Sequence, residues 1–183
     1  MPDDNELMMA VRDGDLDRLG PLFKKHNRSL YNFFLRQTGN PQTSEDLVQD
    51  VFYKILRYRH TYRGESKFTT WMFSIAHNSR IDYYRKNRHE TDDMEALESM
   101  PSDDPTPEDI SVQRNERALL VKALQTLSEE KREVLLLSRF ENMKYEDIAE
   151  VIGCKVGTIK ARVHWALKDL THAYHKLAGS DSP

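Results

Sequence analysis

An acidic stretch in the middle of this chain of 183 residues constrains its fold more than any other feature. Between His89 and Val112 lie nine Asp or Glu residues and no Lys or Arg. The same stretch contains three prolines within seven residues. Like charges, low hydrophobicity and proline all oppose a packed element. We therefore predict two domains, residues 1–89 and 112–183, joined by a flexible acidic linker at 90–111.

Apolar residues recur at helical spacing on both sides of this linker, and convincing strand alternation is absent. The clearest helix begins near Thr43 or Ser44, either of which can cap it. Its apolar positions form one stripe: Leu47, Val48, Val51, Phe52, Ile55 and Leu56. The chain is 38% hydrophobic, which is enough for small helical cores. We predict an all-α fold made of two small helical domains.

The opposite face of that helix is polar and carries Asp46, Gln49, Asp50 and Tyr53. Charged helix faces are usually solvated, so this face could be no more than a polar surface. It could also be a docking surface for a protein partner. The residues alone leave both interpretations open.

The segment Ser66–Arg88 mixes aromatic with basic residues in another predicted helix, which Ser66 can cap. From Lys67 to Arg88, five Lys or Arg residues stand against a single acid, Asp82. Bases of single-stranded nucleic acid stack on aromatic rings, while Lys and Arg neutralise phosphate. The pattern therefore indicates single-strand binding. The alternative is an ordinary amphipathic helix whose tyrosines cover a core.

The segment YEDIAEVIGCKVGTIKARVHWALKDL, residues 145–170, has the pattern of a helix-turn-helix. Ala149 is small, so that two helices can approach each other closely. Gly153 tolerates the positive φ of a tight turn, and Ile159 can be buried beneath it.

The second helix of such a motif enters the major groove of DNA. Lys155, Thr158 and Arg162 lie three to four residues apart, so we expect one face to carry them to the DNA. Lys160 is offset from that face, and we expect it to contact phosphate. The alternative is a helical bundle with a solvated basic face.

The residue types also argue against several classes of protein. The one cysteine, Cys154, excludes an intramolecular disulfide and suits a reducing compartment. No apolar run approaches membrane-spanning length, and the acidic N-terminus does not resemble a signal peptide, so we expect a cytoplasmic protein. Without a phosphate-cradling glycine loop, HExxH or nucleophile elbow, we expect no enzyme activity, cofactor or metal. His172 and His175, spaced i, i+3, are an alternative metal site.

Taken in order, these segments resemble the extracytoplasmic-function (ECF) group of sigma-70-type transcription initiation factors. The resemblance covers about residues 7–178. Its most specific parts are SEDLVQDVFYKIL, FTTWMFSIAHNSRIDYYRK and the block from TLSEEKREVLLL through the helix-turn-helix. It implies that residues 1–89 are region 2, which binds core polymerase and recognises and melts the −10 element. Residues 112–183 would then be region 4, which reads the −35 element.

The resemblance also implies three sets of site residues. Those for binding core polymerase are Asp46, Gln49, Asp50, Phe52 and Tyr53. Those for binding and melting the −10 element are Lys67, Phe68, Trp71, Asn78, Arg80, Tyr83, Tyr84, Arg85 and Lys86. Those for binding the −35 element are Lys155, Thr158, Lys160, Arg162 and His164.

The implied partners are bacterial core RNA polymerase, through its β′ clamp helices and β flap, promoter DNA, and an anti-sigma factor that hides the DNA-binding faces. An autoinhibited state with packed domains is an equal alternative to the anti-sigma factor. The linker could thread toward the RNA exit path of the polymerase or act only as a tether. A dimeric helix-turn-helix regulator, which binds duplex DNA alone, would explain only the second domain.

Overall fold

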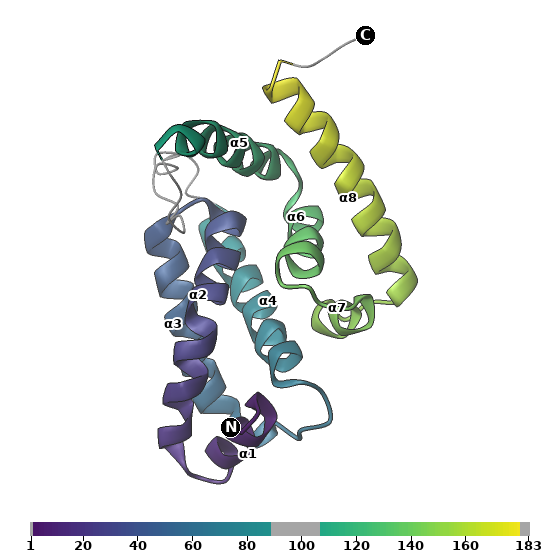
Figure 1. Cartoon of the computed structure of the whole chain (residues 1–183). Helices are drawn as coiled ribbons and strands as arrows, with labels where there is room; N and C mark the ends of the chain where they lie inside the picture. Colours follow the sequence, from purple (N-terminus) through teal and green to yellow (C-terminus); the bar gives the residue numbers. More distant parts are fainter. Residues whose placement is uncertain (1, 89–106, 180–183) are drawn as a thin grey trace.

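The structure, a computed structural model, describes residues 2–88 and 107–179 of the chain and consists there of helices without strands (Figure 1). Residues 89–106, which include most of the predicted linker, lie outside the described residues. The helices of the first half are α1 (Asp4–Arg12), η1 (Leu16–Arg18), α2 (Leu19–Thr38), α3 (Pro41–Tyr58), η2 (Arg59–Thr61) and α4 (Phe68–Asn87). Those of the second half are α5 (Pro107–Thr126), α6 (Glu129–Leu135), η3 (Leu136–Phe140), α7 (Tyr145–Ile152) and α8 (Val156–Leu177). The predicted all-α class is confirmed.

The long helices α2, α3 and α4 form the body of the first half, and α1 packs across one end of it. The start of α3 differs from the prediction. Asn40, not Thr43 or Ser44, caps this helix, because its side chain accepts a hydrogen bond from the Thr43 N–H at 2.9 Å. Pro41 follows as the first helical residue, where its missing N–H costs nothing.

The start of α4 is set by a residue far away in the sequence. Ser66 was predicted to cap this helix, but Lys67 occupies the cap position and its side chain makes no capping bond. Asn5 of α1 supplies the acceptor instead: its Oδ1 takes the Phe68 N–H at 2.7 Å and the Tyr62 hydroxyl at 3.0 Å. An unpaired amide at a helix start is thus satisfied by tertiary packing.

The second half contains the predicted helix-turn-helix. Gly153 ends α7 with φ of 75°, a left-handed conformation, and its N–H donates to the Ala149 carbonyl at 2.9 Å. Ile159 is fully buried, as the motif requires. The helix α5 begins at Pro107, before the predicted domain boundary at residue 112, since proline and the acids after it suit a first helical turn.

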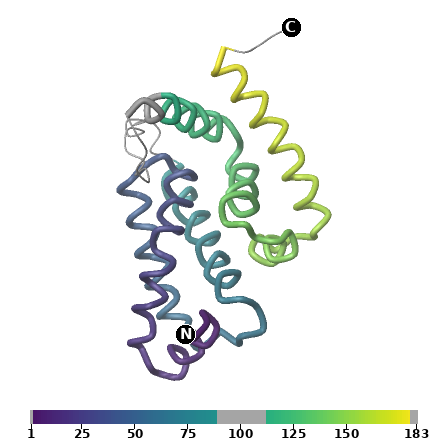
Figure 2. Tube along the Cα trace, viewed as in Figure 1, coloured from purple at the N-terminus to yellow at the C-terminus, as the bar shows by residue number. Residues whose placement is uncertain are grey.

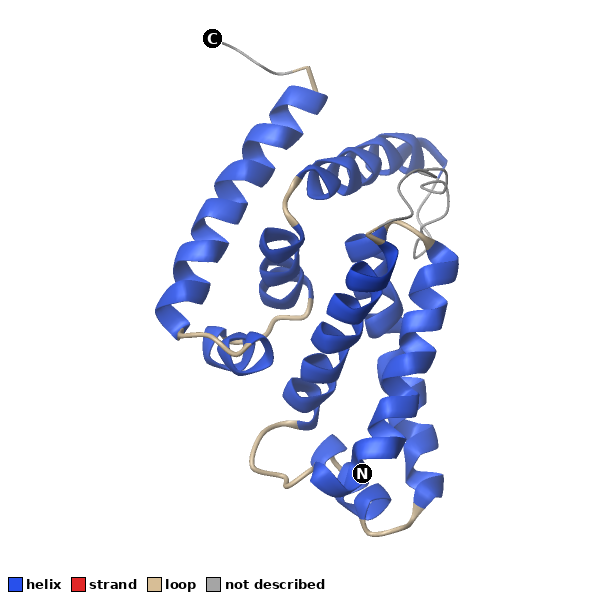
Figure 3. Ribbon diagram, turned by 180° about the vertical axis from the view of Figure 1, so that it is seen from behind, coloured by secondary structure: helices blue, strands red, loops and turns tan. Residues whose placement is uncertain are grey.

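The two halves pack against each other in the described structure. The helix α4 contacts α7, while α2 contacts α5 and α6, and buried residues of both halves belong to one hydrophobic cluster. The Cα trace in Figure 2 and the reverse view in Figure 3 show α6 and α7 between α4 and α8. Over residues 2–88 and 107–179, no helix has the length and apolar character needed to cross a membrane.

Candidate nucleic-acid and protein interfaces

The outer face of α3 presents three of the five residues expected to dock on a protein partner. Asp46, Gln49 and Tyr53 are exposed at i, i+3 and i+7. Phe52 is not on this face, because it belongs to the apolar stripe of α3, which is buried in the core. It is only 7% exposed, and its ring packs edge-on against Phe23 with 4.8 Å between centroids. The expectation that Phe52 lies on a docking face is therefore corrected.

Asp50, the fifth of these residues, faces α4. Its carboxylate lies 2.7 Å from the Lys54 ammonium and accepts the Ser79 hydroxyl at 2.7 Å. Lys54 in turn donates to Ser79 at 2.9 Å and lies 3.6 Å from Asp82. The four residues join α3 to α4, so Asp50 holds the two helices together as well as bordering the exposed face.

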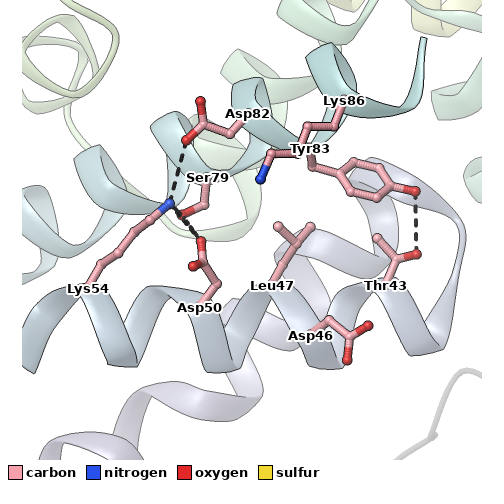
Figure 4. Close-up of a pocket in the computed structure, with 9 residues that line it drawn as sticks. All are labelled: Thr43, Asp46, Leu47, Asp50, Lys54, Ser79, Asp82, Tyr83 and Lys86. Atoms are coloured by element: carbon pink, nitrogen blue, oxygen red, sulfur yellow. Dashed lines mark hydrogen bonds and ion pairs between the residues drawn. The ribbon is translucent and has the colours of Figure 1, made fainter. Parts of the chain in front are cut away.

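A pocket of about 390 Å³ surrounds this network between α3 and α4 (Figure 4). It is lined by Thr43, Asp46, Leu47, Asp50, Lys54, Ser79, Asp82, Tyr83 and Lys86. The Tyr83 and Thr43 hydroxyls lie 3.4 Å apart across one end of it. The pocket brings residues of the predicted protein-docking set next to residues of the predicted −10 set.

The aromatic residues at the start of α4 are packed together. Phe68 is fully buried, which corrects the expectation that it meets DNA. Trp71 is half-buried, with ring centroids 5.2 Å from Tyr62 and 6.4 Å from Phe68. This cluster fixes the indole while leaving part of it in solvent.

Farther along α4, three residues of the predicted −10 set are exposed. They are Asn78, Arg85 and Lys86. The Arg85 guanidinium pairs with Asp82 at 3.0 Å, an exposed contact on the same helix. These side chains are available to a ligand in this conformation.

Another face of α4 meets carboxylates of the second half. Arg80, expected to bind DNA, is only 3% exposed: its guanidinium lies 2.8 Å from Glu133 and 3.5 Å from Glu129 of α6. The other carboxylate oxygen of Glu133 lies 2.8 Å from His77 Nδ1. At the start of the helix, the Lys67 ammonium lies 3.2 Å from Asp147 of α7. In this arrangement Arg80 cannot contact DNA.

Tyr84, also in the predicted −10 set, lies on the same side. Its hydroxyl donates to the Gln37 carbonyl of α2 at 2.9 Å, and burial raises its pKa. The Arg132 guanidinium donates to the same carbonyl, and burial lowers the pKa of Arg132.

Another hydrogen bond joins the two halves at a different place. The Ser29 hydroxyl of α2 donates to Glu141, and burial raises the pKa of the Glu141 carboxyl.

Sequence reasoning did not identify His77 or Glu133 as members of a site. The spacing of His77, Arg80 and Tyr84 at i, i+3 and i+7 does place them on one helix face, and Glu129 and Glu133 share a face of α6. The face that each set occupies on its own helix could therefore be predicted from the sequence. The contact between the two helices could not, because it joins residues more than 50 positions apart.

The exposed face of α8 differs from the face predicted to read DNA. Lys155 and Thr158 are exposed, as expected. Arg162 is turned toward α6, where its guanidinium lies 3.6 Å from Glu130. Lys131 of α6 pairs with Asp169 on that side of α8 as well.

The side chains that α8 leaves in solvent form a basic row. Lys160, His164 and Lys168 are exposed at i, i+4 and i+8, so they lie along one edge of the helix. Trp165, which sequence reasoning passed over, is 53% exposed beside them, with the Lys168 ammonium 5.1 Å from its ring. Lys160, which was predicted to be offset from the DNA-contacting face, is therefore central to the exposed surface.

Comparison with known proteins gives consistent matches in both halves. The sigma-70 region 2 family matches residues 22–90, and the sigma-70 region 4 family matches residues 117–170. The RNA polymerase sigma factor CarQ of Myxococcus xanthus is 32% identical over 93% of this chain and 97% of its own. The ECF RNA polymerase sigma-E factor of Escherichia coli K12 is 25% identical over 95% of each chain. The solved structure of the sigma factor RpoE from Bartonella quintana, in complex with the anti-sigma factor NepR, is similar with 26% identity and a TM-score of 0.70, covering 89% of this chain and 98% of that one.

Proposed function

Because the chain belongs to the sigma-70 family, as an RNA polymerase sigma factor of the ECF type, we propose that its exposed faces divide the work of promoter recognition. The face of α3 docks on core polymerase, α4 handles the −10 element, and α8 reads the −35 element. The observation that carries this division is that three polar or basic faces lie on three different helices of the described chain. In this role the protein supplies no catalytic group, because the polymerase forms the phosphodiester bonds.

The docking face consists of Asp46, Gln49 and Tyr53, and its partner is the pair of clamp helices of the β′ subunit. An exposed tyrosine is a frequent source of binding energy at the centre of a protein interface, and polar side chains such as Asp46 and Gln49 suit its rim. Asp50 joins α3 to α4 through Lys54 and Ser79. Docking of α3 on the polymerase would therefore also fix the position of α4, the helix that meets DNA.

Replacing Asp46 with arginine tests the docking face without disturbing that network. We expect Asp46→Arg to weaken binding to core polymerase about tenfold or more, because a reversed charge at an interface is repelled by the complementary partner. Asp17→Arg, an exposed charge reversal on η1, is the matched control and should bind as the wild type does. Fluorescence titration of core enzyme measures both. Equal affinities for the two variants would remove α3 from the polymerase interface.

The α4 helix captures the melted −10 strand. A base that leaves the stack needs an aromatic surface and neutralised phosphates beside it. Trp71 and Tyr83 offer partly exposed rings, and Asn78, Arg85 and Lys86 offer exposed polar groups along the same helix.

The α8 helix enters the major groove of the −35 element, and the second half also touches the β flap. Its N-terminal residues Lys155 and Thr158 reach base edges, while Lys160, His164 and Lys168 follow the backbone. This assignment departs from the sequence-based emphasis on Arg162, which is paired with Glu130.

Replacing Lys160 tests the basic row on α8. We expect Lys160→Ala to weaken promoter binding by the holoenzyme about equally on all −35 sequences. The slope of log affinity against log salt should fall by about one, as expected for one lost phosphate contact. Arg162→Ala, the comparison variant, should have the smaller effect. The opposite ranking, measured by salt-dependent anisotropy, would return Arg162 to the DNA-facing surface.

The proposed partners follow from the same assignment. Because core RNA polymerase and promoter DNA are in the cytoplasm, we expect the protein to act there. An anti-sigma factor is a further proposed partner, supported by the similarity to RpoE, which was solved in complex with the anti-sigma factor NepR.

Co-purification with bacterial core RNA polymerase, followed by run-off transcription from a library of promoter fragments, tests the proposed function. We expect the protein to join core enzyme and to direct initiation at a defined −35 and −10 pair. A protein that binds duplex DNA alone as a dimer and ignores core enzyme would instead be an ordinary helix-turn-helix regulator.

A further inference from the structure

The exposed surface of α8 carries a second row of side chains beside its basic row. Thr158, Ala161 and Trp165 are exposed at i, i+3 and i+7, a spacing that puts them on one face of the helix. Trp165 is 53% exposed, although tryptophan is on average a highly buried residue. These three residues form the central row of α8, and each of them presents a methyl group or an aromatic ring to solvent.

Cations lie on both sides of the central row. The basic row Lys160, His164 and Lys168 follows one side of it, and Lys155 at the start of the helix lies toward the other side. In Figures 1 and 3, α8 runs along the outer edge of the second half. Cations that flank a recognition helix can neutralise the phosphates, which leaves the row between them facing the base edges.

The central row is poor in groups that hydrogen-bond to bases. Arginine, asparagine and glutamine are among the side chains that bind a base edge through two hydrogen bonds. The helix α8, all of which is described, contains no Asn or Gln, and its one arginine, Arg162, is directed to Glu130 at 3.6 Å. By contrast, alanine, the methyl group of threonine and aromatic rings suit the C5 methyl group that thymine presents in the major groove.

We infer that the central row reads thymine methyl groups, so that A·T pairs in the −35 element are a determinant of promoter choice. The inference rests on the proposed function, since it assumes that α8 enters the major groove of that element. It adds the chemical group that is recognised and a residue, Trp165, that makes the largest contact. Burying a methyl group against the indole removes apolar surface of both partners from water.

The geometry of the row suits this role. From Thr158 to Trp165 the row is about 10 Å long at a rise of about 1.5 Å per residue. That length matches about three base-pair steps of about 3.4 Å each. The Lys168 ammonium lies 5.1 Å from the centre of the Trp165 ring, and the His164 ring lies edge-on with 5.4 Å between centroids. The indole is therefore held next to the cations that follow the DNA backbone.

The test uses the promoter that the holoenzyme selects from the library of promoter fragments. We expect its −35 element to contain more than one A·T pair. Each thymine of that element is then replaced in turn by deoxyuridine, which lacks only the C5 methyl group. Fluorescence anisotropy measures the affinity of the holoenzyme for each duplex. The wild type should bind at least one substituted duplex about three- to fivefold more weakly, as expected for one lost methyl contact.

Three variants separate the methyl contacts from the phosphate contacts. Trp165→Ala should bind the unmodified duplex about fivefold more weakly and lose the response to deoxyuridine at one position, because the methyl group there no longer has a partner. Thr158→Ser removes one methyl group but keeps the hydroxyl, and it should lose the response at a different position. Lys160→Ala is the matched comparison, which should bind every duplex more weakly by the same factor and keep the wild-type response at each thymine.

A selected −35 element without A·T pairs would overturn the inference, as would a wild-type holoenzyme that binds thymine and deoxyuridine duplexes equally well. So would a Trp165→Ala protein that keeps the wild-type response at every thymine. Circular dichroism checks that the variants fold, and Thr158→Ser carries the test by itself if Trp165→Ala does not. A wild-type protein that fails to initiate transcription with core polymerase at any promoter would instead overturn the proposed function itself.

Discussion

Replacing Arg132 with alanine is expected to lower the free energy of unfolding by about 3 to 5 kcal/mol, because several charge-assisted hydrogen bonds in the interior are lost. The guanidinium donates to the carbonyls of Leu124, Gln125 and Leu127 at 2.9 to 3.0 Å, and also to that of Gln37. It is 6% exposed, so water does not replace these bonds. The three nearby carbonyls lie at the end of α5 and the turn into α6, where helix carbonyls lack their usual partners four residues on; that of Leu124 also accepts the Leu127 N–H at 3.2 Å.

Urea unfolding measures the effect of Arg132→Ala, and the midpoint of thermal unfolding should fall by about 10 °C. Arg139→Ala is the matched control, because Arg139 lies in the next helix, η3, and is exposed. Its loss should change the free energy of unfolding by less than about 0.5 kcal/mol. Arg132→Lys keeps the charge but not the planar fork of donors, so it should recover only part of the loss. A change below about 1 kcal/mol for Arg132→Ala would show that the corner between α5 and α6 does not depend on this side chain.

Replacing Trp71 with alanine is expected to reduce promoter opening about tenfold or more, since stacking of a base on an aromatic ring is worth about 1 to 3 kcal/mol. Because the indole also packs on Tyr62 and Phe68, some loss of stability should accompany the change. Permanganate reactivity of unpaired thymines in the holoenzyme–promoter complex measures opening directly.

Two comparison variants separate stacking from folding in the Trp71 experiment. Trp71→Phe keeps an aromatic face and should open promoters nearly as the wild type does. Tyr58→Ala removes another exposed ring, outside the proposed −10 surface, and should leave opening unchanged. A folded Trp71→Ala protein that opens promoters normally would contradict the assignment of α4 to strand capture.

Local patterns in the sequence were sufficient for the helical class and for the helix-turn-helix. The stripe from Leu47 to Leu56 predicted α3 because burial of one helix face follows from spacing alone. Gly153 predicted the turn because few other residues tolerate its positive φ. Helix starts were predicted less well. Asn40 caps α3, and the first amide of α4, that of Phe68, donates to the side chain of Asn5 from the distant helix α1.

The site residues divide in the same way. Asp46, Gln49 and Tyr53 lie on the exposed face of α3 as predicted, whereas Asp50 faces α4 and Phe52 lies on the buried apolar stripe. Arg80 was expected to face DNA from the family resemblance, and Arg162 from its spacing with Lys155 and Thr158. Each is instead directed toward a carboxylate of α6, a helix whose position relative to α4 and α8 is not encoded in any local spacing.

The sequence by itself determined that this protein is helical, where its helix-turn-helix turns, and that its charges are segregated along the chain. These properties depend on residues a few positions apart, and short-range sterics and periodic burial suffice to specify them. Only the tertiary structure decided which cations are free. Glu133 meets Arg80 and Glu130 meets Arg162 because packing of the core brings distant helices together, and whether a charge is available to DNA depends on what that packing places beside it.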